Sequence, residues 1–113
     1  MSSLTPGRNI AIKVPAYRWE ETVAFYRDRV GLPIQKDLDD TIFFAFGEMN
    51  LALDRVATQS QVDIWLELTT DDLDAAMSEL GGPVRDELEP LDGVEGHWTS
   101  DPAGTVLLVR KTR

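Results

Sequence analysis

The stretch Asn-Ile-Ala-Ile-Lys-Val at residues 9–14 returns in pattern as Asp-Ile-Trp-Leu-Glu-Leu at residues 63–68. In both stretches an apolar side chain occupies every second position, which is typical of a strand with one buried face. The side chains that we expect to pack against helices are Ile10, Ile12, Val14, Ile64, Leu66 and Leu68. The polar positions then point to the opposite face of each strand.

A helix is predicted after each of these strands. Pro15 closes the first strand, and the apolar residues that follow recur at spacings of three or four, so they share one helix face. They are Trp19, Val23, Tyr26 and Val30. Gly31 is suited to cap the end of this helix. After the second strand, Thr70 or Asp71 can cap a helix that stops at Gly81.

Short strands complete each repeat. In the first half we expect strands at 34–36, 41–46 and 50–54, with a turn at Gly47-Glu48 between the last two. In the second half we expect a strand near Val84 and a hairpin about residues 101–104.

These elements predict an α+β fold in one domain, with two paired βαβββ units at about 8–56 and 61–111. The units would form a cupped mixed sheet with helices on its outer face, because together they bury a sheet face that neither buries alone.

The composition excludes several classes of function. The 113 residues include 20 acidic and 11 basic side chains, one histidine and no cysteine, for a net charge of −9. The absence of thiols excludes disulfides, iron–sulfur clusters and thiolate zinc sites. An acidic chain repels phosphate backbones, so we expect no nucleic-acid partner. No apolar run reaches the ~18 residues of a membrane span, and residues 1–7 lack a signal peptide's apolar stretch, so we expect a cytoplasmic protein without membrane contact.

Two motifs carry a family resemblance. Val14-Pro15 precedes a helix with Thr-Val-Ala-Phe-Tyr-Arg-Asp at 22–28, and Asp-Pro-Ala-Gly at 101–104 precedes the last strand. With the duplication, these motifs resemble the glyoxalase/bleomycin resistance protein/dioxygenase superfamily, also called the vicinal oxygen chelate superfamily. The resemblance covers about residues 10–109. It says little about activity, because this fold hosts several unrelated chemistries.

The enzymes of this superfamily hold a divalent metal with histidines and glutamates on the first and last strands of each unit. Carried over by position, these ligands fall on Asn9 and Ala52 in the first unit and on Asp63 and Leu108 in the second. Alanine and leucine cannot ligate a metal and neutral asparagine is a weak ligand, so only Asp63 could bind one firmly. We therefore expect no metal and no other cofactor.

What remains resembles the bleomycin-resistance branch, whose members are acidic, metal-free, two-unit chains that dimerise and sequester a drug in clefts between subunits. The resemblance implies a homodimer that binds a small organic molecule, cationic or aromatic, without a metal. The residues that we expect to line the ligand cleft are Asn9, Lys13, Asp54, Asp63, Trp65, Glu67, Trp98, Leu108 and Arg110. Trp65 offers a planar stacking surface, and packing in a dimer interface is the competing interpretation. Lys13 and Glu67 occupy equivalent positions in the two units and could pair.

Two other functions stay open. A lyase, isomerase or dioxygenase of the same superfamily would use a displaced metal site of Asp54, Asp63 and Glu67, or acid–base chemistry by carboxylates and His97, the only imidazole of the chain. A purely structural module would instead fill its cleft with its own side chains.

Overall fold

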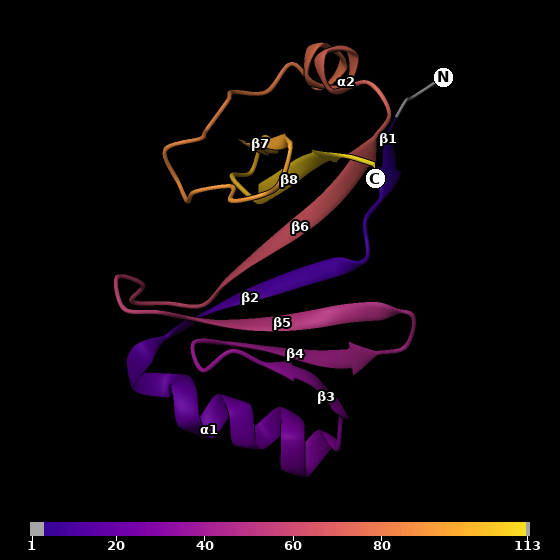
Figure 1. Cartoon of the computed structure of the whole chain (residues 1–113). Coiled ribbons are helices and arrows are strands. Elements are labelled where there is room, and N and C mark those ends of the chain that lie inside the picture. Colours follow the sequence, from indigo (N-terminus) through magenta and orange to yellow (C-terminus); the bar gives the residue numbers. More distant parts are fainter. Residues whose placement is uncertain (1–3, 113) are drawn as a thin grey trace. The chain divides into compact units, whose positions relative to one another are not determined.

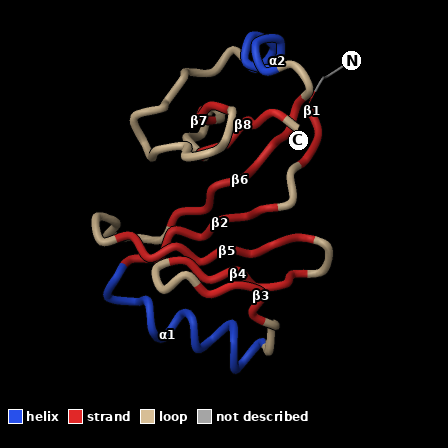
Figure 2. The backbone as a smooth tube through the Cα atoms, viewed as in Figure 1, coloured by secondary structure: helices blue, strands red, loops and turns tan. Residues whose placement is uncertain are grey.

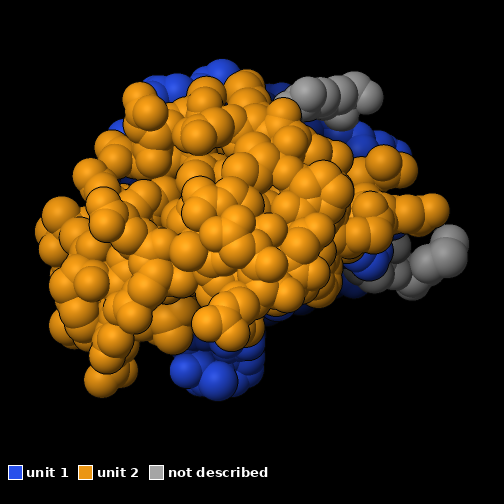
Figure 3. All heavy atoms as spheres, turned by 90° about the horizontal axis from the view of Figure 1, so that it is seen from below, with its two compact units in different colours: residues 1–7, 65–113 blue, residues 8–64 orange. Residues whose placement is uncertain are grey.

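The computed structural model describes residues 4–112, which divide into two compact units. The N-terminal unit contains residues 8–64 and is unit 2 in Figure 3. The C-terminal unit contains the described residues 4–7 and 65–112 and is unit 1 in Figure 3. Figures 1 and 2 show the helices and strands of both units.

The N-terminal unit has one helical segment and four strands. Its elements are β2 (Asn9–Pro15), η1 (Ala16–Arg18), α1 (Trp19–Ala24), η2 (Phe25–Val30), β3 (Ile34–Asp37), β4 (Thr41–Phe46) and β5 (Met49–Val56). The strands lie in the order β3-β4-β5-β2, with β5 parallel to β2 and the other pairs antiparallel. The predicted strands of this half and the turn at Gly47-Glu48 are confirmed.

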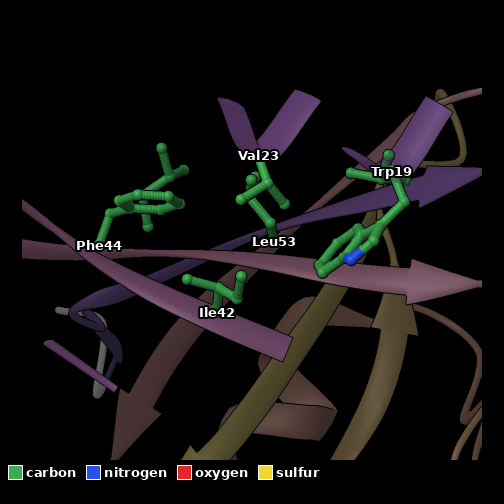
Figure 4. Packing of buried hydrophobic residues seen from close by; sticks show 7 residues of the cluster. Trp19, Val23, Ile42, Phe44 and Leu53 are labelled. Atoms are coloured by element: carbon green, nitrogen blue, oxygen red, sulfur yellow. The ribbon is translucent and has the colours of Figure 1, made fainter. Parts of the chain in front are cut away.

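The core of the N-terminal unit lies between its sheet and α1. Figure 4 shows Trp19 and Val23 from the helix beside Ile42, Phe44 and Leu53 from the strands. The buried residues of this core are Val14, Trp19, Val23, Ile42, Phe44, Leu51 and Leu53. Ile10, Ile12 and Tyr26 pack against it, so the predicted apolar face of the first strand is confirmed.

The helix ends with a wider turn than the sequence pattern predicts. Residues Phe25–Val30 form a π-helix, and Gly31 caps it with φ 80° in the left-handed region. In a π-helix each turn holds more residues, so a spacing of four no longer returns to the same face. Val30 is therefore 49% exposed, and its predicted place on the buried stripe is wrong.

The C-terminal unit has one helix and four strands. Its elements are β1 (Leu4–Pro6), β6 (Asp63–Thr70), α2 (Leu73–Leu80), β7 (Gly96–Ser100) and β8 (Val106–Lys111). β6 begins with Asp63 and Ile64, which belong to the N-terminal unit. The strands lie in the order β1-β6-β8-β7, with β8 parallel to β6 and the other pairs antiparallel. The hairpin predicted about 101–104 joins β7 to β8.

Two local predictions in the C-terminal unit are wrong. No strand forms near Val84, because the preceding Pro83 has no N–H and only Arg85 N donates to the neighbouring strand, at Trp98 O, 2.8 Å away. The residue that caps α2 is Asp72, whose Oδ1 accepts from Ala75 N at 3.1 Å. Thr70 is instead bonded through Oγ1 to the Asp72 N–H.

The helix side of the C-terminal unit is thinly covered. Ala76 of α2 and Val109 of β8 are 0% exposed, and the eight residues of α2 pack over β8. Ile64 and Leu66 of β6 are 48% and 40% exposed. The prediction that these two side chains pack against a helix is wrong, because the short α2 lies over the neighbouring strand.

Each unit combines a helix with a mixed sheet, which confirms the predicted α+β class and the duplicated architecture, apart from the missing strand near Val84. Within residues 4–112, no helix is long and apolar enough to span a membrane.

Candidate functional site

A buried ion pair lies on the sheet face of the N-terminal unit that points away from α1. Lys13 is 3% exposed, and its Nζ lies 2.6 Å from Asp54 Oδ2. The two residues are direct neighbours because β2 and β5 run parallel in this register. The second oxygen of Asp54 accepts a hydrogen bond from Thr41 Oγ1 at 2.6 Å. Both carboxylate oxygens of Asp54 are therefore engaged within the unit.

The same face carries an amide pair at the other end of the strands. Asn50 Nδ2 donates to Asn9 Oδ1 at 3.0 Å, again between register neighbours of β2 and β5. Asn50 was not among the predicted site residues, although the alternation that selected Asp54 also places it on this face. Asp63, at the start of β6, accepts a hydrogen bond from the Ile64 N–H at 3.0 Å.

Two tryptophans pack together in the C-terminal unit. The rings of Trp65 and Trp98 meet edge to face with centroids 5.0 Å apart, and each residue is 8% exposed. Trp98 Nε1 donates to Glu89 O at 3.1 Å, which joins the loop before β7 to the sheet. Each indole is thus largely covered by the protein itself.

A second ion pair accompanies the tryptophans. Glu67 of β6, Leu108 of β8 and Trp98 of β7 are register neighbours and so share one sheet face. Arg110 Nη1 lies 3.5 Å from Glu67 Oε2, and the two side chains are 14% and 8% exposed. Gly7 N donates to Glu67 O at 2.8 Å, and a Cβ on Gly7 would overlap the Glu67 side chain, so this close approach requires glycine.

The Asn9, Lys13 and Asp54 side chains, with Asn50 and Thr41, form what we call the polar face of the N-terminal unit. The polar face of the C-terminal unit consists of Trp65, Glu67, Trp98, Leu108 and Arg110. In the N-terminal unit these residues come from β2 and β5, apart from Thr41 of β4. In the C-terminal unit they come from β6 and β8, apart from Trp98 of β7. The register thus brings together within each unit most of the side chains that sequence alone predicted as ligand-binding.

His97 lies on the opposite side of its strand from Trp98, since successive side chains of β7 alternate and His97 is the register neighbour of Val109. His97 therefore does not lie on the polar face that Trp98 shares with Leu108. Its Nδ1 lies 2.8 Å from Asp86 Oδ2. This hydrogen bond lowers the pKa of Asp86 below its usual value. Desolvation raises the pKa, and a further hydrogen bond from the Trp98 N–H lowers it.

The positions expected to hold a metal do not fit a divalent ion. Ala52 and Leu108 have no donor atom, and the oxygen of Asn9 already accepts from Asn50. Among the described residues, no three carboxylate or imidazole side chains lie close enough to hold a metal ion. The displaced site would need Asp54 and Glu67, whose carboxylates face Lys13 and Arg110 instead.

A groove of about 690 Å³ lies on the helix side of the N-terminal unit. It is formed by the end of β2, the helical segment from Tyr17 to Tyr26, and residues 60–62 of the loop before β6. We call it the α1 groove. None of the predicted ligand-binding residues line it. The helical periodicity places Tyr26 in the core. It gives no indication that residues 60–62 line a groove together with this tyrosine.

Comparison of the sequence with protein-family models and with curated proteins found no match. Solved structures are similar. A hypothetical protein from Bacillus halodurans C-125 aligns with a TM-score of 0.68 over 99% of this chain and 96% of that one, at 12% identity. The Mn(II)-bound glyoxalase from Novosphingobium aromaticivorans aligns with a TM-score of 0.66 and 22% identity over 98% of this chain, which spans 40% of the glyoxalase.

A glyoxalase/bleomycin resistance protein/dioxygenase superfamily member from Vibrio splendidus 12B01 aligns with a TM-score of 0.61 over 96% of this chain and 100% of that one, at 10% identity. The chain therefore has the fold of that superfamily, which confirms the resemblance predicted from its motifs.

Proposed function

We propose that this chain, which has the fold of the glyoxalase/bleomycin resistance/dioxygenase superfamily, binds a small organic molecule without a metal ion. The observation that carries the proposal is a cation–carboxylate pair on the polar face of each unit, between β2 and β5 in the N-terminal unit and between β6 and β8 in the C-terminal unit. These are the strands that the superfamily's enzymes use for metal ligands.

The ion pairs oppose metal binding by simple electrostatics. The ammonium group of Lys13 lies 2.6 Å from Asp54, one of the three carboxylates of the displaced metal site. A divalent cation there would be repelled by the ammonium and would have to displace it from the carboxylate, which is costly in a buried, weakly polar environment.

The polar faces also supply the groups that recognise an organic ligand. Asn9, Asp54, Asp63, Leu108 and Arg110 are half-buried, which is typical of side chains that line a binding site. An indole suits an aromatic molecule, and a cationic one would displace Lys13 or Arg110 from its carboxylate. We propose Asn9, Lys13, Asp54, Asp63, Trp65, Glu67, Trp98, Leu108 and Arg110 as the ligand-binding residues.

Metal independence is tested by elemental analysis of protein purified without a metal-affinity tag, followed by thermal denaturation with added Mn²⁺, Ni²⁺, Zn²⁺ or Fe²⁺. We expect substoichiometric metal and an unchanged melting temperature. Stoichiometric metal, or a rise in melting temperature that saturates with one metal, would support the enzyme alternative and overturn the proposal.

Ligand binding is tested by a thermal-shift screen of aromatic metabolites and cationic antibiotics, because a ligand that binds only the folded state raises its melting temperature. A compound bound at the N-terminal polar face should lose affinity in Lys13→Met, and one bound at the C-terminal polar face should lose affinity in Trp98→Phe. The matched control is Lys36→Met, since Lys36 is an exposed lysine of β3 outside both faces. Equal affinity in all four proteins would place the compound elsewhere.

We also propose that the protein is a homodimer in the cytoplasm. Leu66, Leu80 and Val84 are 40%, 37% and 56% exposed, and a second copy would cover apolar side chains of this kind. Sedimentation velocity should give twice the 12.6 kDa mass of one chain at micromolar concentration. A single-chain mass at that concentration would contradict the dimer.

A further inference from the structure

The α1 groove has the size and lining of a small-molecule site, and it is separate from the polar faces. Its volume of about 690 Å³ lies inside the range of roughly 300–1,000 Å³ that ligand pockets occupy. Ile12 and Val14 line it from the helix side of β2, whereas Lys13 between them points to the opposite side. A ligand in this groove therefore does not touch the Lys13–Asp54 pair.

The walls of the groove are held by the core of the N-terminal unit. Val14, at its base, is 2% exposed. Tyr26 packs against Phe44 of the core with ring centroids 6.3 Å apart, and Phe25 meets Tyr26 edge to face at 5.2 Å. Because these rings rest on packed residues, the aromatic wall exists before any ligand arrives, and little ordering is needed on binding.

The opposite wall is tied to the helical segment by a hydrogen bond. Tyr17 Oη donates to Ser60 O at 3.1 Å. This bond links the start of the helical segment to the loop that carries residues 60–62, so both sides of the groove keep a defined spacing. The tyrosine ring itself is 69% exposed and presents an aromatic surface that a ligand can cover.

The charged groups of the groove are one cation and one anion. Arg18 Nη1 lies 2.9 Å from Glu21 Oε1, and the two side chains are 60% and 61% exposed. The Arg18 guanidinium also lies 5.4 Å from the centre of the Tyr17 ring. An exposed pair of this kind contributes little stability. A ligand with its own adjacent carboxylate and ammonium can therefore replace the one internal pair with two new pairs at little cost.

We propose that the α1 groove binds a small zwitterionic aromatic molecule with the chemistry of a free aromatic amino acid. The ring of the ligand lies among Tyr17, Phe25 and Tyr26. Its carboxylate pairs with Arg18 and its ammonium group pairs with Glu21. This charge complementarity selects a zwitterion over a simple cation or anion, since either of those leaves one of the two charged side chains without a ligand partner.

The proposal is tested by calorimetric titration of the full chain with L-phenylalanine, L-tyrosine and L-tryptophan. Three matched analogues each lack one feature: phenethylamine has no carboxylate, 3-phenylpropionate has no ammonium group, and L-alanine has no ring. We expect at least one aromatic amino acid to bind. Each analogue should bind at least about tenfold more weakly, as the loss of one charged contact or of the ring predicts.

Variants assign the binding to the groove. Arg18→Gln should reduce the affinity for the amino acid to about the affinity for phenethylamine. The affinity for phenethylamine should itself stay unchanged. Glu21→Gln should do the same relative to 3-phenylpropionate. Phe25→Ala removes a ring that is 52% exposed, so the chain should fold, as circular dichroism checks, and lose affinity for all aromatic ligands. Arg27→Gln is the control, because Arg27 pairs with Asp28 outside the groove.

Four results would overturn the inference. The first two are that no aromatic amino acid binds, or that the amino acid and its analogues bind equally well. The third is that binding is lost in Lys13→Met but not in Phe25→Ala. The fourth is that the chain self-associates with rising concentration and that Phe25→Ala abolishes this association. The last result would assign the groove to a second copy of the chain. Metal independence and binding at the polar faces are tested with other probes and variants, so they stand or fall separately.

Discussion

The two units of this chain share a strand pattern but differ in how much apolar surface they bury on the helix side of the sheet. The N-terminal unit buries a core of seven residues between its sheet and α1. The C-terminal unit leaves Leu66 exposed on its helix side and buries Trp65 and Trp98 on the other face. The difference follows from the helices, because α1 continues through η2 to Val30 whereas α2 ends after eight residues.

A duplicated sequence pattern therefore does not imply that the two units are stabilised in the same way. In the N-terminal unit the face away from the helix is free to carry polar groups, since the core on the other side supplies the stability. In the C-terminal unit that same face has to hold both the aromatic pair and the Glu67–Arg110 pair. Four experiments test this difference, in order of decreasing effect.

The largest effect is expected from Phe44→Ala. Phe44 is 0% exposed in the N-terminal core, so its removal should cost about 3–5 kcal/mol of unfolding free energy by lost burial and a residual cavity. Phe46→Ala on the same strand is the control, since Phe46 is 48% exposed, and it should cost well under half as much. Urea denaturation measures both, and equal costs would show that the helix-side core does not dominate this unit.

The next effect compares the two ion pairs. Lys13→Met leaves the partly buried Asp54 without its cation and should cost about 2–3 kcal/mol. Arg110→Met should cost less, because the Arg110–Glu67 contact is 3.5 Å long against 2.6 Å for Lys13–Asp54. Lys13→Met with Asp54→Asn should recover part of the loss. Hydrogen exchange shows in which unit the backbone amides lose protection. A larger loss of stability in Arg110→Met than in Lys13→Met would contradict the prediction.

A smaller effect is expected from Trp98→Phe. The substitution keeps an aromatic ring beside Trp65 but removes the Nε1 donor to Glu89 O, so it should cost about 1–2 kcal/mol. Thermal denaturation measures the cost, and hydrogen exchange should place the loss in β6 and β7. Unchanged stability would mean that the loop before β7 is held without this bond.

The smallest effect at neutral pH concerns the carboxyls of the C-terminal unit. The bond to His97 lowers the pKa of Asp86, and the Thr105 N–H lowers the pKa of Asp101 from its ordinary value of 3.8. A carboxyl whose pKa is lower in the folded than in the unfolded state stabilises the fold when the pH is above the unfolded-state pKa. This contribution is lost as the pH falls through the folded-state pKa. Stability should therefore fall below about pH 4.

Asp86→Asn tests this pH dependence directly. The variant should lack the contribution of Asp86 at neutral pH, and its stability should fall less steeply on acidification than that of the wild type. Urea midpoints from pH 7 to pH 2 measure the slopes. A variant slope equal to the wild-type slope would show that Asp86 does not contribute to acid sensitivity.

Much of the fold could be predicted because it rests on local periodicity. Strict alternation located β2 and β6, and the glycines at 31 and 81 both adopt the left-handed conformation of helix caps. The predictions that failed depended on competition between neighbours. Thr70 and Asp71 are as able to cap a helix as Asp72, and only the packed structure selects among them.

The sheet face on which most candidate residues lie could be predicted, but their pairing could not. Alternation placed Lys13, Glu67 and Trp65 on the polar faces. It could not show that Lys13 lies beside Asp54, since that depends on the register of two strands separated by about forty residues. The α1 groove was missed for the same reason, because residues 60–62 reach the helix only through the path of a loop.

The α+β class and the duplication could be predicted from the sequence alone. Each of these depends on the identity and spacing of nearby residues. The pairing of the charges, the covering of the tryptophans and the position of a ligand-sized groove became known from the three-dimensional structure. Those properties arise from contacts between distant segments, whose register and packing no local pattern contains.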